Sequence, residues 1–135
     1  TSLPPELSMD RFARRVYTIA GIYGLIVMLP QYFMEDRIGR DYPPPITHPE
    51  YFCGFVGIVI VWQIAFLVIA RDPARYRPLM PVTVLEKLAF AVPVLLLYRD
   101  GRVASAVLLF AAIDLVLGTL FLIAWRRTGA APTAT

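Results

Sequence analysis

Hydrophobic residues form four long runs in this chain, and the charged residues and prolines lie mostly between them. Each run has 18–23 residues, and about 20 apolar residues in a helix cross the ~30 Å hydrocarbon core of a bilayer. Helices are favoured because every backbone polar group inside lipid has to be bonded within the segment. We therefore predict an all-α fold, a transmembrane four-helix bundle that forms one integral membrane domain over residues 1–135. The predicted spans are 16–33, 51–70, 79–98 and 103–125.

The composition agrees with a membrane location and excludes several kinds of enzyme. Hydrophobic residues make up 58% of the 135 residues, and the mean hydropathy is +0.62, which is too apolar for a soluble domain of this size. Four spans leave only short tails and connections, so a separate catalytic domain has no room. One cysteine, Cys53, and one histidine, His48, exclude an internal disulfide and a haem held by two histidines of one chain. The sequence predicts no cofactor and no metal site.

The basic residues indicate an orientation. Eight arginines lie on one side of the predicted spans, in the N-terminal tail, the second connection and the C-terminal tail, and four lie in the first and third connections. Cytoplasmic loops of membrane proteins carry an excess of Lys and Arg, so we predict that both termini are cytoplasmic. The net charge of +3 then indicates contact with anionic lipid headgroups rather than with nucleic acid.

The first connection, residues 34–50, is the longest. Two interpretations stay open for it: a segment that covers the outer mouth of the bundle, or a simple link between two helix ends. Thr47-His48-Pro49-Glu50 predicts a capping box, with Thr47 at the N-cap and Glu50 at the third helical position of the second span. His48 is then exposed, and His48 and Glu50 are the candidate ligand-binding residues of this loop. Asp100-Gly101 predicts a tight turn between the last two spans.

Small residues recur at helical spacing and predict where helices approach each other closely. The first two spans each carry a glycine pair three residues apart, and the fourth span carries small residues seven apart. The predicted packing residues are Gly21, Gly24, Gly54, Gly57, Ala111 and Gly118.

Polar side chains in the spans form the most informative pattern. Asp114 lies near the middle of the fourth run, where a carboxylate costs about 2.5–3.5 kcal/mol on insertion scales. At 1.5 Å per residue, Gln63 and Glu86 lie about 10 Å from the cytoplasmic helix ends, and Asp114 about 16 Å. Tyr23 falls at a similar level, and Lys87 can turn either inward or toward the interface. We expect Asp114, Gln63, Glu86 and Tyr23 to form one polar layer.

Each member of this layer also has a purely structural explanation. Thr83-Val84-Leu85-Glu86 matches a second capping box, in which Glu86 only closes the start of a shorter third helix. Gln63 and Tyr23 are also explained by hydrogen bonds between helices, and Asp114 by a protonated, hydrogen-bonded structural carboxyl. No catalytic residue is assigned from the sequence.

The stretches Ala20-Gly21-Ile22-Tyr23-Gly24, Pro44-Pro45-Ile46-Thr47-His48-Pro49-Glu50, Arg71-Asp72-Pro73 and Glu86-Lys87 resemble a family of small bacterial four-helix membrane proteins of uncharacterised activity. The similarity runs to about Asp114-Leu115-Val116-Leu117-Gly118. The general plan resembles DoxX-like proteins and, more distantly, the EXPERA group, although no stretch matches the catalytic residues of the latter. The resemblance implies a multi-pass protein of the bacterial inner membrane, and no reaction.

Three functions fit these observations. The first is an accessory or interaction subunit of a larger inner-membrane complex, because the chain is small, lacks redox ligands and offers glycine faces to other subunits or to a second copy. The second is a membrane-embedded binder of a small lipophilic ligand, or an acid–base enzyme acting on it, through Asp114 and Glu86. The third is a proton-coupled transporter with Asp114 as the proton carrier. The sequence favours the first, with the lipid bilayer and other membrane subunits as partners.

Overall fold

The computed structural model describes residues 5–129, which are helical apart from short connections and contain no strand. The elements are α1 (Pro5–Met28), the 3₁₀ segment η1 (Leu29–Phe33), α2 (Glu35–Asp41), α3 (Pro49–Arg71), the 3₁₀ segment η2 (Arg77–Leu79), α4 (Met80–Arg99) and α5 (Val107–Arg127). The prediction of an all-α fold is confirmed.

Four helical segments are long and apolar enough to cross a membrane, which indicates a multi-pass membrane protein. They cover Asp10–Phe33, Pro49–Arg71, Arg77–Arg99 and Val107–Arg127. Large apolar side chains on their outer faces are exposed, as expected of helices whose surroundings are lipid. Examples are Ile19, Ile26, Ile58, Val61, Leu85, Leu109 and Val116.

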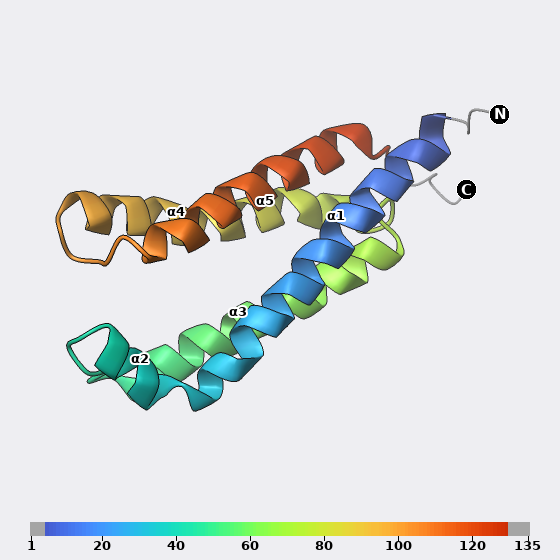
Figure 1. Cartoon of the computed structure of the whole chain (residues 1–135). Coiled ribbons are helices and arrows are strands. Elements are labelled where there is room, and N and C mark those ends of the chain that lie inside the picture. Colours follow the sequence, from blue (N-terminus) through green and yellow to red (C-terminus); the bar gives the residue numbers. More distant parts are fainter. Residues whose placement is uncertain (1–4, 130–135) are drawn as a thin grey trace.

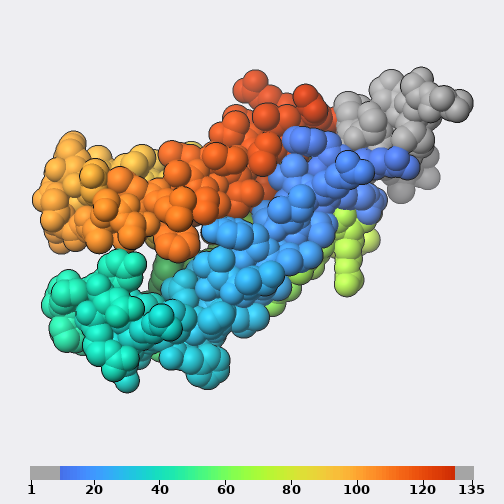
Figure 2. Space-filling view, viewed as in Figure 1, coloured from blue at the N-terminus to red at the C-terminus, as the bar shows by residue number. Residues whose placement is uncertain are grey.

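The four helices are arranged as two antiparallel pairs that diverge from each other. α1 packs along α3, α4 packs along α5, and a smaller contact between α1 and α5 joins the pairs (Figure 1). The pairs meet at the end of the molecule where α1 begins and α5 ends, here called the terminal end. They separate toward the opposite end, which carries α2 (Figure 2). The divergence leaves space between the pairs that a uniformly packed bundle would fill.

A group of side chains at the junction, here called the hub, contains one residue from each long helix: Tyr17, Phe66, Thr83 and Phe121. The Tyr17 and Phe121 rings are stacked with centroids 4.4 Å apart, and the Phe66 and Phe121 centroids lie 5.0 Å apart. The Tyr17 hydroxyl and Thr83 Oγ1 form a 2.8 Å hydrogen bond, and Thr83 Oγ1 donates to the Met80 carbonyl. All four side chains are fully buried, so the hub fixes the two helix pairs to each other.

Arginines join helix ends at the terminal end. The Arg14 guanidinium donates to the carbonyls of Ala70 and Arg71, which are at the C-terminus of α3 and have no partner within the helix. Arg77 Nε donates to the Thr128 carbonyl at 2.7 Å and lies over the Trp125 ring. A cation near a helix C-terminus is also favoured by the helix dipole. The first contact joins α1 to α3, and the second joins the start of α4 to the end of α5, so each strengthens one helix pair.

Two helix starts differ from the prediction. α3 begins at Pro49 after His48, with no side-chain cap, so the predicted capping box of Thr47 and Glu50 is wrong. Glu50 Oε1 instead lies 3.1 Å from His48 Nδ1. The second predicted box fails too, because Thr83 lies inside α4 and its hydroxyl serves the hub. This removes the interpretation of Glu86 as a cap.

The connections also differ in part. The first connection contains the short helix α2, which the sequence pattern did not predict, and α5 begins at Val107 rather than Val103. The predicted turn after α4 is present: Gly101 has a φ of +70°, a left-handed conformation that glycine adopts without strain. α4 and α5 therefore form the expected hairpin.

The glycines of α1 and α3 differ in how closely they are packed. A Cβ on Gly21 would lie 2.7 Å from Leu67 Cδ2 and 2.9 Å from the Gln63 backbone oxygen, and one on Gly57 would lie 2.6 Å from the Tyr32 hydroxyl. A Cβ on Gly54 would meet no atom within 4 Å. Gly21 thus allows α1 and α3 to touch, whereas Gly54 has no packing role among the described residues.

This difference predicts opposite outcomes for two matched substitutions. Gly21→Ala should lower the free energy of unfolding by about 1–3 kcal/mol, since the backbone of α3 must move away. Gly54→Ala should leave it unchanged or raise it by up to about 1 kcal/mol through helix propensity. Thermal unfolding in detergent, followed by circular dichroism, compares the two. Equal melting temperatures for both variants would contradict the assigned contact.

Candidate functional site

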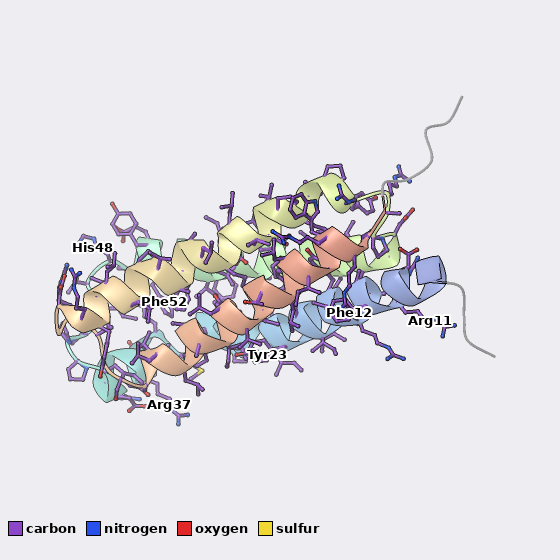
Figure 3. All side chains as sticks on the ribbon, turned by 90° about the horizontal axis from the view of Figure 1, so that it is seen from above. Arg11, Phe12, Tyr23, Arg37, His48 and Phe52 are labelled. Carbon is purple, nitrogen blue, oxygen red and sulfur yellow. The ribbon has the colours of Figure 1, made fainter. Side chains whose placement is uncertain are left out.

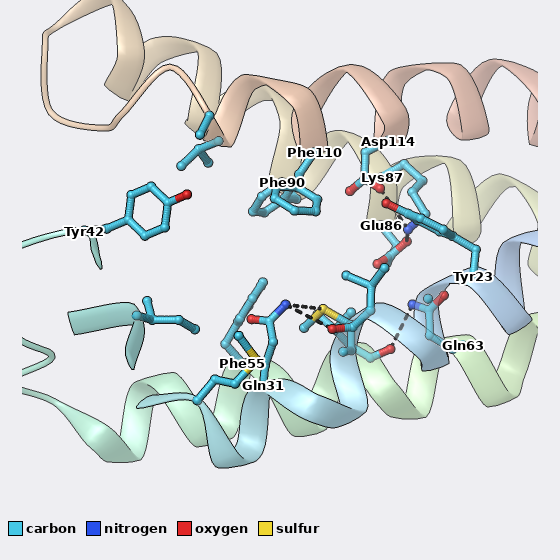
Figure 4. Close-up of a pocket in the computed structure, with 18 residues that line it drawn as sticks. Tyr23, Gln31, Tyr42, Phe55, Gln63, Glu86, Lys87, Phe90, Phe110 and Asp114 are labelled. Carbon is cyan, nitrogen blue, oxygen red and sulfur yellow. Dashed lines mark hydrogen bonds and ion pairs between the residues drawn. The ribbon is translucent and has the colours of Figure 1, made fainter. Parts of the chain in front are cut away.

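The space between the helix pairs is a cavity of about 520 Å³. Most of its wall is apolar, and α1, α3, α4 and α5 all contribute (Figure 4). Its lining includes the four side chains of the predicted polar layer, Tyr23, Gln63, Glu86 and Asp114, together with Lys87. Ligand cavities in proteins typically have about 300–1,000 Å³, with apolar walls and a few polar groups. The size and lining therefore suit a small lipophilic molecule.

Three charged side chains, here called the charged triad, lie together at one end of this cavity. Lys87 Nζ lies 3.2 Å from Glu86 Oε2 and 3.2 Å from Asp114 Oδ1, so one ammonium bridges carboxylates from α4 and α5 (Figure 4). The Lys87 side chain is 5% exposed, against 13% for Glu86 and 16% for Asp114. The sequence left the direction of Lys87 open, and the structure turns it inward.

Phe66 and Gly118 contact the Lys87 side chain in addition to the two carboxylates. Its Nζ lies 5.2 Å from the centre of the Phe66 ring, within the range of a cation–π contact. Gly118 of α5 faces the stem of the side chain, because a Cβ there would lie 3.3 Å from Lys87 Cβ. Ala111, one turn before Asp114 in α5, is fully buried. The small residues of α5 thus face α4, and Phe66 links the charged triad to the hub.

Gln63 and Tyr23 line the cavity but have different relations to the triad. Gln63 is 2% exposed, and its Nε2 donates to the Val59 carbonyl of its own helix. Its side chain lies against Gly24, where an added Cβ would be 1.9 Å from Gln63 Oε1. Gln63 therefore packs α3 against α1 instead of bonding to the carboxylates. The Tyr23 ring points toward the charged triad from α1 (Figure 4).

The other end of the cavity is lined by the first connection. Met34, Ile38 and Tyr42, from the segment around α2, contribute to the wall. The Tyr42 ring faces the cavity on the side opposite the triad (Figure 4). Of the two interpretations left open by the sequence, this position favours a segment that covers the mouth of the bundle.

His48 and Glu50, the loop candidates, lie away from this site. Their side chains are 67% and 64% exposed and pair with each other. Figure 3 places His48 and Arg37 at the opposite end of the molecule from Arg11. Neither His48 nor Glu50 is among the described residues that line the cavity. Residues 5–129 also contain no group of three or more His, Cys, Asp or Glu side chains placed to hold a metal ion.

The aromatic part of the lining was not predicted. Phe55 of α3, Phe90 of α4 and Phe110 of α5 contribute to the cavity wall, and the Phe55 and Phe90 ring centroids lie 6.1 Å apart. In an apolar run, such residues are indistinguishable from those that face lipid. Each lies one to two turns away from a polar-layer residue of its own helix, Gln63, Glu86 or Asp114, and this spacing was the available signal.

Comparisons with protein-family models, curated proteins and solved structures found no match to this chain. The resemblance to small bacterial four-helix proteins and to DoxX-like proteins therefore stays a prediction. The case for a function rests on the geometry of the cavity.

Proposed function

We propose that this protein binds a small lipophilic molecule within the membrane, with its hydrocarbon body in the apolar part of the cavity and its polar group at the charged triad. The observation that carries the proposal is a cavity of about 520 Å³ that ends on three ionisable side chains. Charged groups at membrane depth are costly and usually belong to sites that use them. Both parts of an amphiphilic ligand thus find matching surroundings.

A binding role explains the divergence of the helix pairs better than a purely structural role does. An ion pair needed only for packing would be enclosed by the bundle. Here the carboxylates face a cavity. Acid–base chemistry on the bound molecule, through Glu86 and Asp114, is a further step that this arrangement allows.

Two other functions predicted from the sequence stay predictions. An accessory subunit would need a partner surface, and a proton-coupled transporter would need Asp114 to alternate between two sides of the membrane. Neither has an observation of its own in its favour, so the binding function takes precedence over the accessory role that the sequence favoured.

The location we propose is the bacterial inner membrane, with the terminal end in the cytoplasm. The support for this orientation is the distribution of arginines. Eight lie in the N-terminal tail, the connection between α3 and α4 and the C-terminal tail, and four lie in the other two connections. Tyr42 and α2 then cover the cavity from the extracytoplasmic side.

A pair of neighbouring tryptophan substitutions tests the binding function. Val27 lines the cavity, whereas Ile26 is 69% exposed on the outer face of α1. The probe is 4-(biphenyl-4-yl)butan-1-ol, titrated by calorimetry into protein in phosphatidylcholine nanodiscs. Wild type and Ile26→Trp should bind one equivalent, and Val27→Trp should bind at least about ten times more weakly because the indole fills the cavity. Equal binding by both variants would show that the probe binds in the lipid or on the outer surface of the protein rather than in the cavity.

A further inference from the structure

The charged triad carries an unequal number of charges. At their ordinary ionisation, Glu86 and Asp114 contribute two negative charges and Lys87 one positive charge. No other described residue that lines the cavity is charged. Since an uncompensated charge in an apolar environment is very costly, the remaining negative charge has to be met by a proton or by a cation.

The exposure of the three side chains indicates where a cation would bind. Lys87 is enclosed by Phe66, Glu86 and Asp114, so its ammonium is the least accessible of the three groups. Lys87 contacts Asp114 through Oδ1 and Glu86 through Oε2, and no hydrogen bond to the second oxygen of either carboxylate is formed among the described residues. Glu86 Oε2 is buried against Lys87 without an aligned hydrogen bond. At this end of the cavity, the carboxylates are therefore more accessible to a ligand than the ammonium is.

The geometry points to a lipophilic amine as the ligand class, an inference that rests on the proposed binding function. Its ammonium bonds to the free oxygens of Asp114 and Glu86, which makes the site neutral. Its hydrocarbon part lies toward Phe55, Phe90 and Phe110. A charge-assisted hydrogen bond is about twice as strong as one between neutral groups, so a cationic head is preferred over a hydroxyl.

Two other classes of ligand fit less well. A lipophilic carboxylate would bring a third negative charge beside Asp114 and Glu86 and would reach only the enclosed Lys87. A divalent metal ion such as Ca²⁺ takes six to eight oxygen ligands. Residues 5–129 place no metal-holding group here, and the apolar walls would remain unused.

Three probes with one hydrocarbon body and different heads test this inference. They are 4-(biphenyl-4-yl)butylamine, the corresponding butanol and 4-(biphenyl-4-yl)butanoic acid, titrated at pH 7 into wild type, Asp114→Asn, Glu86→Gln and Val27→Trp in phosphatidylcholine nanodiscs. The partition of each probe into lipid is measured in nanodiscs without protein and subtracted, so that affinities can be compared between probes as well as between variants. Wild type should bind the amine about ten times more tightly than the alcohol, and the acid most weakly. Asp114→Asn should reduce the preference for the amine to about threefold or less.

The outcomes distinguish a failure of the proposed ligand class from a failure of the proposed binding function. Equal affinity for amine and alcohol in wild type, or a preference for the acid, would overturn the amine and leave the binding function standing. Binding of all three probes that is the same in wild type and Val27→Trp would overturn both. Should Asp114→Asn not fold, the wild-type comparison decides, with Glu86→Gln as the second variant expected to weaken amine binding selectively.

Discussion

Replacing Lys87 with methionine should lower the free energy of unfolding by about 3–5 kcal/mol, the cost of removing one partner from a buried ion pair. Methionine keeps the apolar stem of the side chain and removes only the charge. Glu86 and Asp114 would then face each other without the ammonium that now lies 3.2 Å from both. The loss arises from the two uncompensated carboxylates rather than from packing.

A matched control and a compensating variant isolate this electrostatic cause. Leu88→Met, at the next and partly exposed position of α4, should change the melting temperature in detergent very little. Adding Glu86→Gln and Asp114→Asn to Lys87→Met should restore most of the stability, because the charges that lacked a partner are gone. Wild-type stability in Lys87→Met alone would show that Lys87 does not compensate the carboxylates.

The polar layer illustrates what the sequence determines. Helices rise by a fixed 1.5 Å per residue, so counting from helix ends places Tyr23, Gln63, Glu86 and Asp114 at similar depth. The structure brings all four to one cavity. Counting residues from the helix ends gives the depth of a side chain but does not identify the groups to which it bonds. Lys87 has a long flexible side chain with two acceptable directions, and Gln63 satisfies its amide on its own helix.

Loops and helix starts were less predictable. Threonine followed three residues later by glutamate is a frequent cap, but at Thr47 the chain turns into the helix two residues later, at Pro49. α2 carries acidic residues in its first turn and Arg40 in its last, a charge pattern typical of a helix. The neighbouring prolines masked it, since they indicate extended chain.

The angle between the helix pairs is a feature of the fold that no pattern in the sequence predicts. It depends on which apolar residues turn inward, and an apolar run in a membrane helix has no polar face to mark the inward side. Tyr17, Phe66 and Phe121 are buried at the junction, whereas Phe33 is 91% exposed. Nothing in their local sequence separates these two situations.

Phe121→Ala should therefore have the second largest effect on stability. The Phe121 ring stacks on Tyr17 and tilts against Phe66, so its removal leaves a void where three helices meet. Phenylalanine-to-alanine changes in cores cost about 3–5 kcal/mol, and we expect about 3 kcal/mol because part of the usual gain on leaving water is absent in lipid. The melting temperature in detergent measures this loss.

Loss of the hub should also change the distance between the helix pairs. Phe110→Ala is the matched control, since Phe110 lies on the same helix but is 43% exposed and lines the cavity. Spin labels on exposed Ile26 and Leu109 report the separation of α1 and α5 by electron paramagnetic resonance. Phe121→Ala should broaden the distance distribution, because the pairs are held together mainly at the hub, and Phe110→Ala should not. An unchanged distribution in Phe121→Ala would mean that the remaining contacts between α1 and α5 suffice to set the angle.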